Sequence, residues 1–210
     1  MRDQKKFKPQ NETALTVGQR KIVAVLLAKT TASLDSIRHE VNHVLNVLEW
    51  LSVIRPNAPV SMSYAGLLHD CDRLFPERRM REKDFTTYEA YKRAHAKNCA
   101  TIAGALLINL GVPSKTVAET KKIIEDHEWG TTPNSYIVMA ADSLSYFTFN
   151  ILDYFRERGS EATEKKIAFM YNRLHSKERA LLHSADLPFK QSIVLMKLFK
   201  RATNKKRRTL

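Results

Sequence analysis

Apolar residues recur at helical spacing in a series of segments along this 210-residue chain. In the first segment, Ile22, Val23 and Leu26 share one face of a helix, and later segments repeat the pattern. No segment shows the strict alternation of a half-buried strand, and 6 glycines and 7 prolines leave little material for many tight turns. The pattern therefore predicts an all-α fold, a single-domain helical bundle around a sizeable core.

Capping residues, prolines and glycines divide the chain into expected helices. These cover residues 17–27, 36–54, 61–70, 86–110, 114–128, 135–158, 163–182 and 188–202, with a loop over residues 73–85. We expect this helical domain to span residues 13–202, between basic, solvated ends at 1–12 and 203–210. There is no signal-like apolar stretch and no apolar run near the roughly 18 residues of a membrane span, which predicts a soluble, cytoplasmic protein.

The charge balance favours acidic partners. The chain has 35 Lys and Arg against 22 Asp and Glu, a formal net charge of +13. Nucleotides, other phosphoesters, nucleic acid and anionic membrane surfaces all fit such a charge. The two cysteines, Cys71 and Cys99, lie in apolar-periodic segments without CxxC spacing, so we expect buried free thiols rather than a disulfide or a zinc site.

Histidine and aspartate residues recur on or beside the apolar faces of the expected helices. His43, for example, shares a stripe with Val47 and Leu51. A buried carboxylate without a partner is costly, and neutral imidazole and carboxylate are common ligands of divalent metals. The pattern therefore predicts a metal site inside the bundle. Its candidate residues are His43, His69, Asp70, His95, His127 and Asp142.

The order of these residues resembles the HD superfamily of metal-dependent phosphohydrolases. His43 with the following Val-Leu-Asn-Val is similar to the first histidine of that family, and Gly66-Leu-Leu-His-Asp70 is similar to its doublet. Ala140-Ala-Asp-Ser-Leu144 is similar to its final aspartate motif. The resemblance covers residues 36–146 and leaves the expected helices at 163–202 outside it. It implies a helical bundle of the HD type.

The resemblance also implies a ligand set. The first metal ion would be bound by His43, His69, Asp70 and Asp142. A second would be held by His95 and His127, with Asp70 as a bridge. Histidine and aspartate ligands suit Mn, Fe, Co, Ni or Zn. The implied activity is hydrolysis of a nucleotide or another small phosphoester by a metal-bound hydroxide.

Catalysis of this kind needs cations and proton carriers beside the metal. Lys92, one turn before His95, and Arg73, just after the doublet, are candidates to neutralise the phosphate. His95 or His127 could position water or donate a proton to the leaving oxygen. In the last expected helix, a further set of cations could reach the substrate: Lys197, Lys200 and Arg201.

Three alternatives stay open. His39-Glu40-Val41-Asn42-His43 satisfies the HExxH pattern of zinc proteases, with Glu40 as general base. That interpretation leaves the other candidate ligands unexplained, so we place His39 near the pocket rim or on the surface and Glu40 on a solvated face. A minority of HD-like proteins use the same ligands to hold two irons as mixed-valence oxygenases. A basic helical module could instead bind nucleic acid through its tails.

Overall fold

The computed structural model describes residues 15–204, and the all-α prediction is confirmed, because these residues contain no strand. The predicted tail at 1–12 and residues 205–210 lie outside the described residues. Between residues 15 and 204, no helix is both long and apolar enough to cross a membrane. The longer helices are α1 (Val17–Lys29), α2 (Leu34–Ile54), α3 (Val60–Leu68), α4 (Tyr88–Asn109), α5 (Ser114–Asp126), α6 (Pro133–Ser145), α7 (Ile151–Asn172), α8 (Ser176–Ser184) and α9 (Ile193–Asn204).

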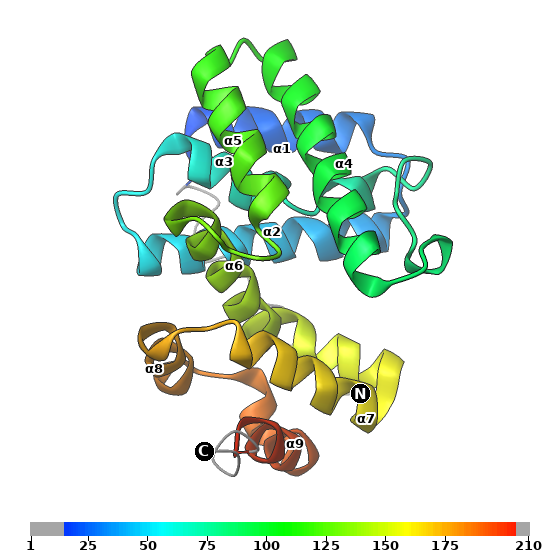
Figure 1. Ribbon diagram of the computed structural model, residues 1–210, viewed down its shortest axis with the longest axis vertical. Coiled ribbons are helices and arrows are strands. Elements are labelled where there is room, and N and C mark those ends of the chain that lie inside the picture. Colours follow the sequence, from blue (N-terminus) through cyan, green and yellow to red (C-terminus); the bar gives the residue numbers. More distant parts are fainter. Residues whose placement is uncertain (1–14, 205–210) are drawn as a thin grey trace.

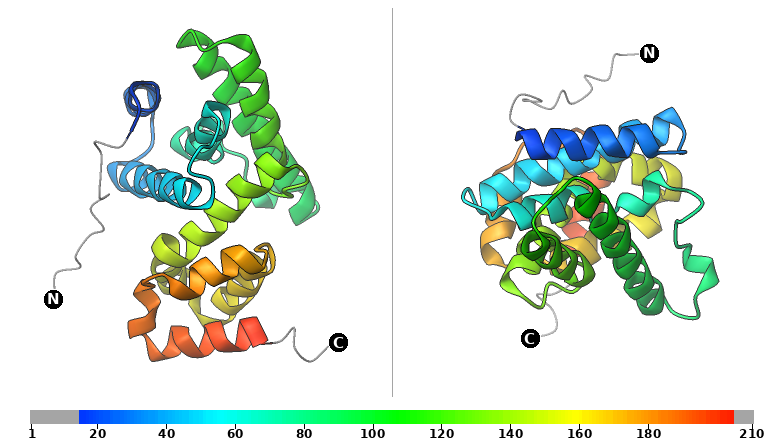
Figure 2. Two further views of the ribbon diagram at one scale, coloured as in Figure 1. Left: turned by 90° about the vertical axis from the view of Figure 1, so that its left-hand side faces the viewer. Right: turned by 90° about the horizontal axis from the view of Figure 1, so that it is seen from above.

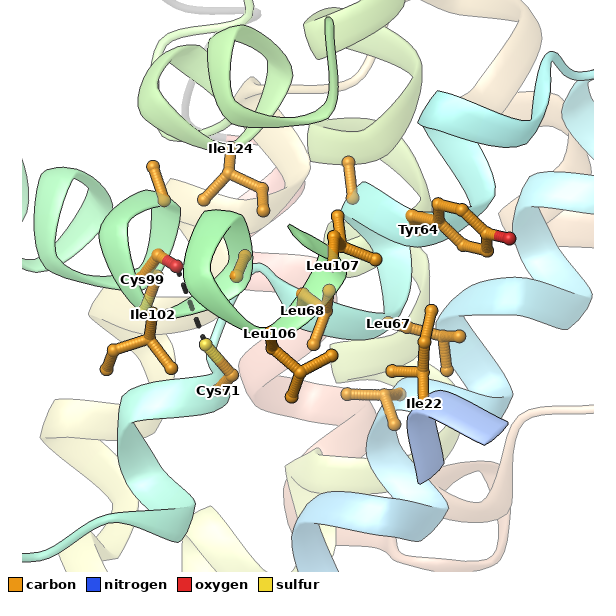
Figure 3. Close-up of a cluster of buried hydrophobic side chains, with 14 of the residues drawn as sticks. Ile22, Tyr64, Leu67, Leu68, Cys71, Cys99, Ile102, Leu106, Leu107 and Ile124 are labelled. Atoms are coloured by element: carbon orange, nitrogen blue, oxygen red, sulfur yellow. Dashed lines mark hydrogen bonds between the residues drawn. The ribbon is translucent and has the colours of Figure 1, made fainter. Parts of the chain in front are cut away.

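Helices α1 to α5 pack around a first hydrophobic core (Figure 1). Figure 3 shows Ile22 of α1, Leu68 of α3 and Leu107 of α4 converging in this core, where each is almost fully buried. Cys71 and Cys99 are buried free thiols, as predicted, and the Cys71 thiol donates a 3.6 Å hydrogen bond to the Cys99 carbonyl. This core holds the ends of α3 and α5 close to α4.

Helix α6 connects this group of helices to a second core formed with α7 and α9 (Figures 1 and 2). A π-helical turn, η4 (Tyr146–Asn150), follows α6 directly and leads into α7. The Phe147 ring lies 5.8 Å from the Phe199 ring and 6.5 Å from the ring of Phe189, which belongs to the 3-10 helix η5 (Pro188–Gln191). Aromatic packing therefore attaches α9 to the chain segment that follows α6.

The predicted helix boundaries are accurate in the first half and wrong near α7. The expected helices at 135–158 and 163–182 are instead α6, the π-helical turn, α7 and α8. Gly159, at φ 73°, interrupts the helical backbone inside α7, a conformation that favours glycine. Extended backbone at His175 then separates α7 from α8. The expected loop at 73–85 contains the end of the 3-10 helix η2 (Cys71–Leu74) and all of η3 (Glu82–Asp84).

Candidate metal centre

The ends and inner faces of five helices bring all six predicted ligand residues together. They come from α2 (His43), the end of α3 (His69 and Asp70), α4 (His95), the end of α5 (His127) and α6 (Asp142). Besides the set Asp72, His95 and Cys99, two sets of three have ligand atoms within 4.8 Å of one another, and these two contain only predicted ligand residues. We call them the first group (His43, His69 and Asp142) and the second group (Asp70, His95 and His127). Either group could hold a metal ion.

In the first group, two imidazoles face one carboxylate. His43 Nε2 lies 3.5 Å and His69 Nε2 3.7 Å from Asp142 Oδ1, and the two Nε2 atoms lie 3.4 Å apart. His69 Nδ1 donates to the Gly66 carbonyl at 2.9 Å, and His43 Nδ1 lies 3.1 Å from the Ser145 hydroxyl. Because both Nδ1 atoms have partners, both Nε2 atoms are directed to the same point, as in metal-ligating histidines.

The second group adjoins the first, because its Asp70 carboxylate also lies close to the first group's histidines. Asp70 Oδ1 lies 2.8 Å from His95 Nε2, whereas Oδ2 lies 3.5 Å from His69 Nε2. His127 Nδ1 donates to the Ile124 carbonyl at 2.6 Å, and its Nε2 atom lies 3.4 Å from Glu128 Oε1 as well as within reach of the other ligand atoms of the second group. The rings of His69 and His127 are 5.2 Å apart. The Asp70 carboxylate therefore stands between the two groups.

The carboxylates make both groups favourable for a cation. Burial lowers the pKa of His69, but Asp70 and Asp142 more than offset it and raise the value to about 9. The pKa of His95 is lowered by burial and raised by Asp70 and Asp72, with a net rise to about 12. Burial lowers the pKa of His43 to about 4. A positive charge is thus stabilised at His69 and at His95, and a proton or a metal ion can supply it.

Asp72 is a residue of the centre that the sequence interpretation missed. It is fully buried, and its Oδ2 atom lies 3.1 Å from His95 Nδ1. Asn98 Nδ2 lies 3.5 Å from the same oxygen, while Oδ1 has no hydrogen-bond partner among the described residues. Asp72 therefore fixes the orientation of the His95 ring through Nδ1, the ring nitrogen that does not face Asp70. Asp72 lies two residues after Asp70, and a second aspartate so close to the His69-Asp70 pair could have identified it from the sequence.

Arg73 lies at the predicted place, beside Asp70. Its Nη2 atom is 2.8 Å from Asp70 Oδ2, and Nη1 is 3.4 Å from Glu40 Oε1. The expectation that Glu40 lies on a solvated face is wrong, because its side chain is buried against Arg73. Glu40 and Asp70 together hold the guanidinium at the edge of the centre.

A cluster of cations extends from the second group to α7. Lys92 of α4 is ion-paired with Glu128, whose other oxygen lies 3.6 Å from Arg173 Nη2. Arg173 also donates to the His127 carbonyl at 3.2 Å, and its Nη1 atom lies 3.6 Å from Asp142 Oδ2. Arg173 and Glu128 were not predicted, since Arg173 lies outside residues 36–146 and Glu128 matches no quoted motif.

Lys166 of α7 approaches the same region. Burial, with repulsion from Lys92 and Arg173, lowers the pKa of Lys166 to about 8. In the last helix, Arg201 pairs with Glu164 at 2.7 Å, and the reach of that helix to the substrate stays a prediction. Arg173, which directly follows α7, is a C-terminal cation that contacts a ligand residue, Asp142.

The HExxH pair does not assemble into a site. The His39 ring packs 5.3 Å from Phe149, and its Nδ1 atom lies 3.9 Å from Asp153 Oδ2. Across residues 15–204, none of the groups able to hold a metal includes His39. His43 instead belongs to the first group, with ligands from α3 and α6.

These features define an all-α protein with two adjacent His/Asp groups, each able to hold a cation. The chain belongs to the DUF4202 family, described as a domain of unknown function, whose sequence profile matches residues 27–194. That range contains both ligand groups and also α7. No curated protein and no solved structure shows detectable similarity to the chain.

Proposed function

We propose that this protein is a metal-dependent phosphohydrolase of the HD type that acts on a small anionic phosphoester. The observation that carries the proposal is the pair of adjacent His/Asp groups, with Asp70 of the second group also next to His69 of the first and partly buried cations beside both. The resemblance in residues 36–146 and the net charge of +13 point in the same direction.

The donor set fits a divalent transition metal. The first group offers two imidazole nitrogens and a carboxylate oxygen, and the second offers the same combination. Such donors suit Mn, Fe, Co, Ni or Zn. When bound, such an ion polarises a phosphoryl oxygen and lowers the pKa of water, so that hydroxide is available near neutral pH.

The protein's own residues would hold and orient the reacting groups. His43, His69 and Asp142 would hold the first ion, and Asp70, which faces both His69 and His95, would be a ligand at either position. Arg73 lies where it can balance charge on the substrate as well as on Asp70. His127 Nε2, which lies 3.4 Å from Glu128 Oε1, would bind a second ion or orient water.

The test is phosphate release from a panel of phosphomonoesters and nucleotides. The protein is treated with a chelator and then loaded separately with Mn²⁺, Fe²⁺, Co²⁺, Ni²⁺ and Zn²⁺. We expect hydrolysis of at least one substrate with metal, its loss on chelation and its return on reloading. A protein that binds none of these ions, or that hydrolyses equally well without them, would contradict the proposal.

A second candidate function rests on the position of Asp70 between the two groups, because a carboxylate that faces two metal positions would also suit an HD-type oxygenase that holds two irons. Oxygen consumption by the iron-loaded protein, with no phosphate release from the panel, would favour that function. Nucleic-acid binding that weakens steeply with salt and survives alanine at both Asp70 and Asp142 would favour a binding module instead.

Asp72→Asn is expected to weaken metal binding to the second group by about 10- to 100-fold, as loss of an outer-shell carboxylate does. The amide keeps the volume of Asp72 but loses the charge behind His95 Nδ1. Calorimetric metal titration measures the effect. The matched control is Asp84→Asn, since Asp84 is exposed and pairs only with Arg81 among the described ion pairs. Equal affinities in both variants would show that Asp72 does not support the site.

A further inference from the structure

Three cations, from α4, from α7 and from the residue that follows α7, gather beside the two groups. The Lys166 ammonium and the Arg173 guanidinium each lie 5.2 Å from the centre of the same Phe169 ring. Arg173 and Lys92 both pair with Glu128. The shared Phe169 ring therefore places Lys166 near Arg173, and the shared Glu128 places Lys92 near Arg173. We call Lys92, Lys166 and Arg173 the cation cluster.

The cation cluster carries more positive charge than its neighbours neutralise. Glu128 pairs with Lys92 and Arg173, and the other carboxylate at Arg173 is Asp142, a ligand in the proposed function. Over residues 15–204, no ion pair joins Lys166 to a carboxylate, and Asp142 and Glu128 only partly offset the burial and repulsion that lower its pKa. When Asp142 serves as a metal ligand, Glu128 is, among the described residues, the one carboxylate that still pairs with cations of the cluster. The cluster then has two positive charges in excess. A partly buried cation without a counter-ion is costly unless an anion binds there.

We propose that the cation cluster is the subsite for a doubly charged terminal phosphate, as in a phosphomonoester. Arg173 Nη1 lies 3.6 Å from Asp142 Oδ2, so an anion held by this guanidinium lies next to the first group. Two excess positive charges match a phosphate dianion better than the single charge of a phosphodiester. The inference rests on the proposed function for the reaction that follows binding. The binding of phosphate itself can be measured without any hydrolysis.

The test is calorimetric titration of inorganic phosphate at neutral pH into the full chain, with and without bound metal. Lys166→Gln is expected to weaken phosphate binding about tenfold or more, the loss of one charge-assisted hydrogen bond. Lys166→Arg retains most of the affinity. The matched control is Lys165→Gln, because Lys165 is highly exposed and pairs with Glu161. It is expected to bind phosphate like the unsubstituted chain.

Metal content and thermal unfolding, measured on the same samples, separate the outcomes. Weaker phosphate binding by Lys166→Gln, with unchanged metal content and unfolding temperature, supports the subsite. If that variant binds phosphate normally, or if the unsubstituted chain binds none at millimolar concentration, the subsite is wrong. If dimethyl phosphate, a monoanion, binds as tightly as phosphate, the preference for a dianion is wrong. Lys166-dependent binding in a chain that takes up no metal would support the subsite and overturn the proposed function.

Discussion

Replacement of Asp70 by alanine is expected to abolish phosphoester hydrolysis and to deplete the bound metal. Asp70 is the residue of the second group that also faces the first, with one oxygen 2.8 Å from His95 Nε2 and the other 3.5 Å from His69 Nε2. Because loss of an outer-shell partner alone costs about 10- to 100-fold, loss of this ligand should lower activity by more than about 100-fold. Elemental analysis per chain and phosphate release measure the two effects.

The control for this substitution is Asp186→Ala, since Asp186 is exposed and lies outside both groups. It should keep the metal content and activity of the unsubstituted chain. Asp70→Ala also leaves Arg73 with Glu40 as its remaining carboxylate partner at the site, so a circular dichroism spectrum must accompany the assay. A folded Asp70→Ala variant with full metal and full activity would overturn both the ligand set and the proposed function.

The convergence of the ligand residues was predictable because each of them follows local periodicity. His43 lies one helical turn before Val47, and both are buried on the same face of α2. His95 and Cys99 repeat this relation in α4. Inward stripes on successive helices must meet in the core of a bundle, and the structure brings their histidines together.

The buried charges were less predictable, because their partners come from distant segments. Glu40 looks like a solvated residue of α2 until Arg73, 33 residues later, is placed against it. Arg173 follows α7 directly and lies beside Asp142 of α6 in the folded chain. The π-helical turn and all of α7 separate the two residues in the sequence. Sequence periodicity predicts which face of a helix is buried but not where that helix packs in the fold. The break in helical backbone at Gly159 also makes the boundaries of α7 hard to predict from the sequence.

Phe147→Ala is expected to lower the free energy of unfolding by about 3–5 kcal/mol, the usual cost of truncating a buried phenylalanine. Phe147 is fully buried in the second core and packs against the rings of Phe189 and Phe199. That loss is a large part of the roughly 5–15 kcal/mol that stabilises a typical domain. Urea denaturation followed by circular dichroism measures it.

The control is Phe169→Ala, whose ring is 39% exposed and should cost no more than about 1 kcal/mol in unfolding free energy. An unchanged urea midpoint for Phe147→Ala would show that the second core does not limit stability.

Disruption of the second core is also expected to affect phosphate binding more than metal binding. Phe147 belongs to the core that holds α7, so its truncation should weaken phosphate binding through Lys166 and Arg173 under conditions where the chain still binds metal. His43, His69 and His95 would keep their positions, because they belong to helices packed around the first core.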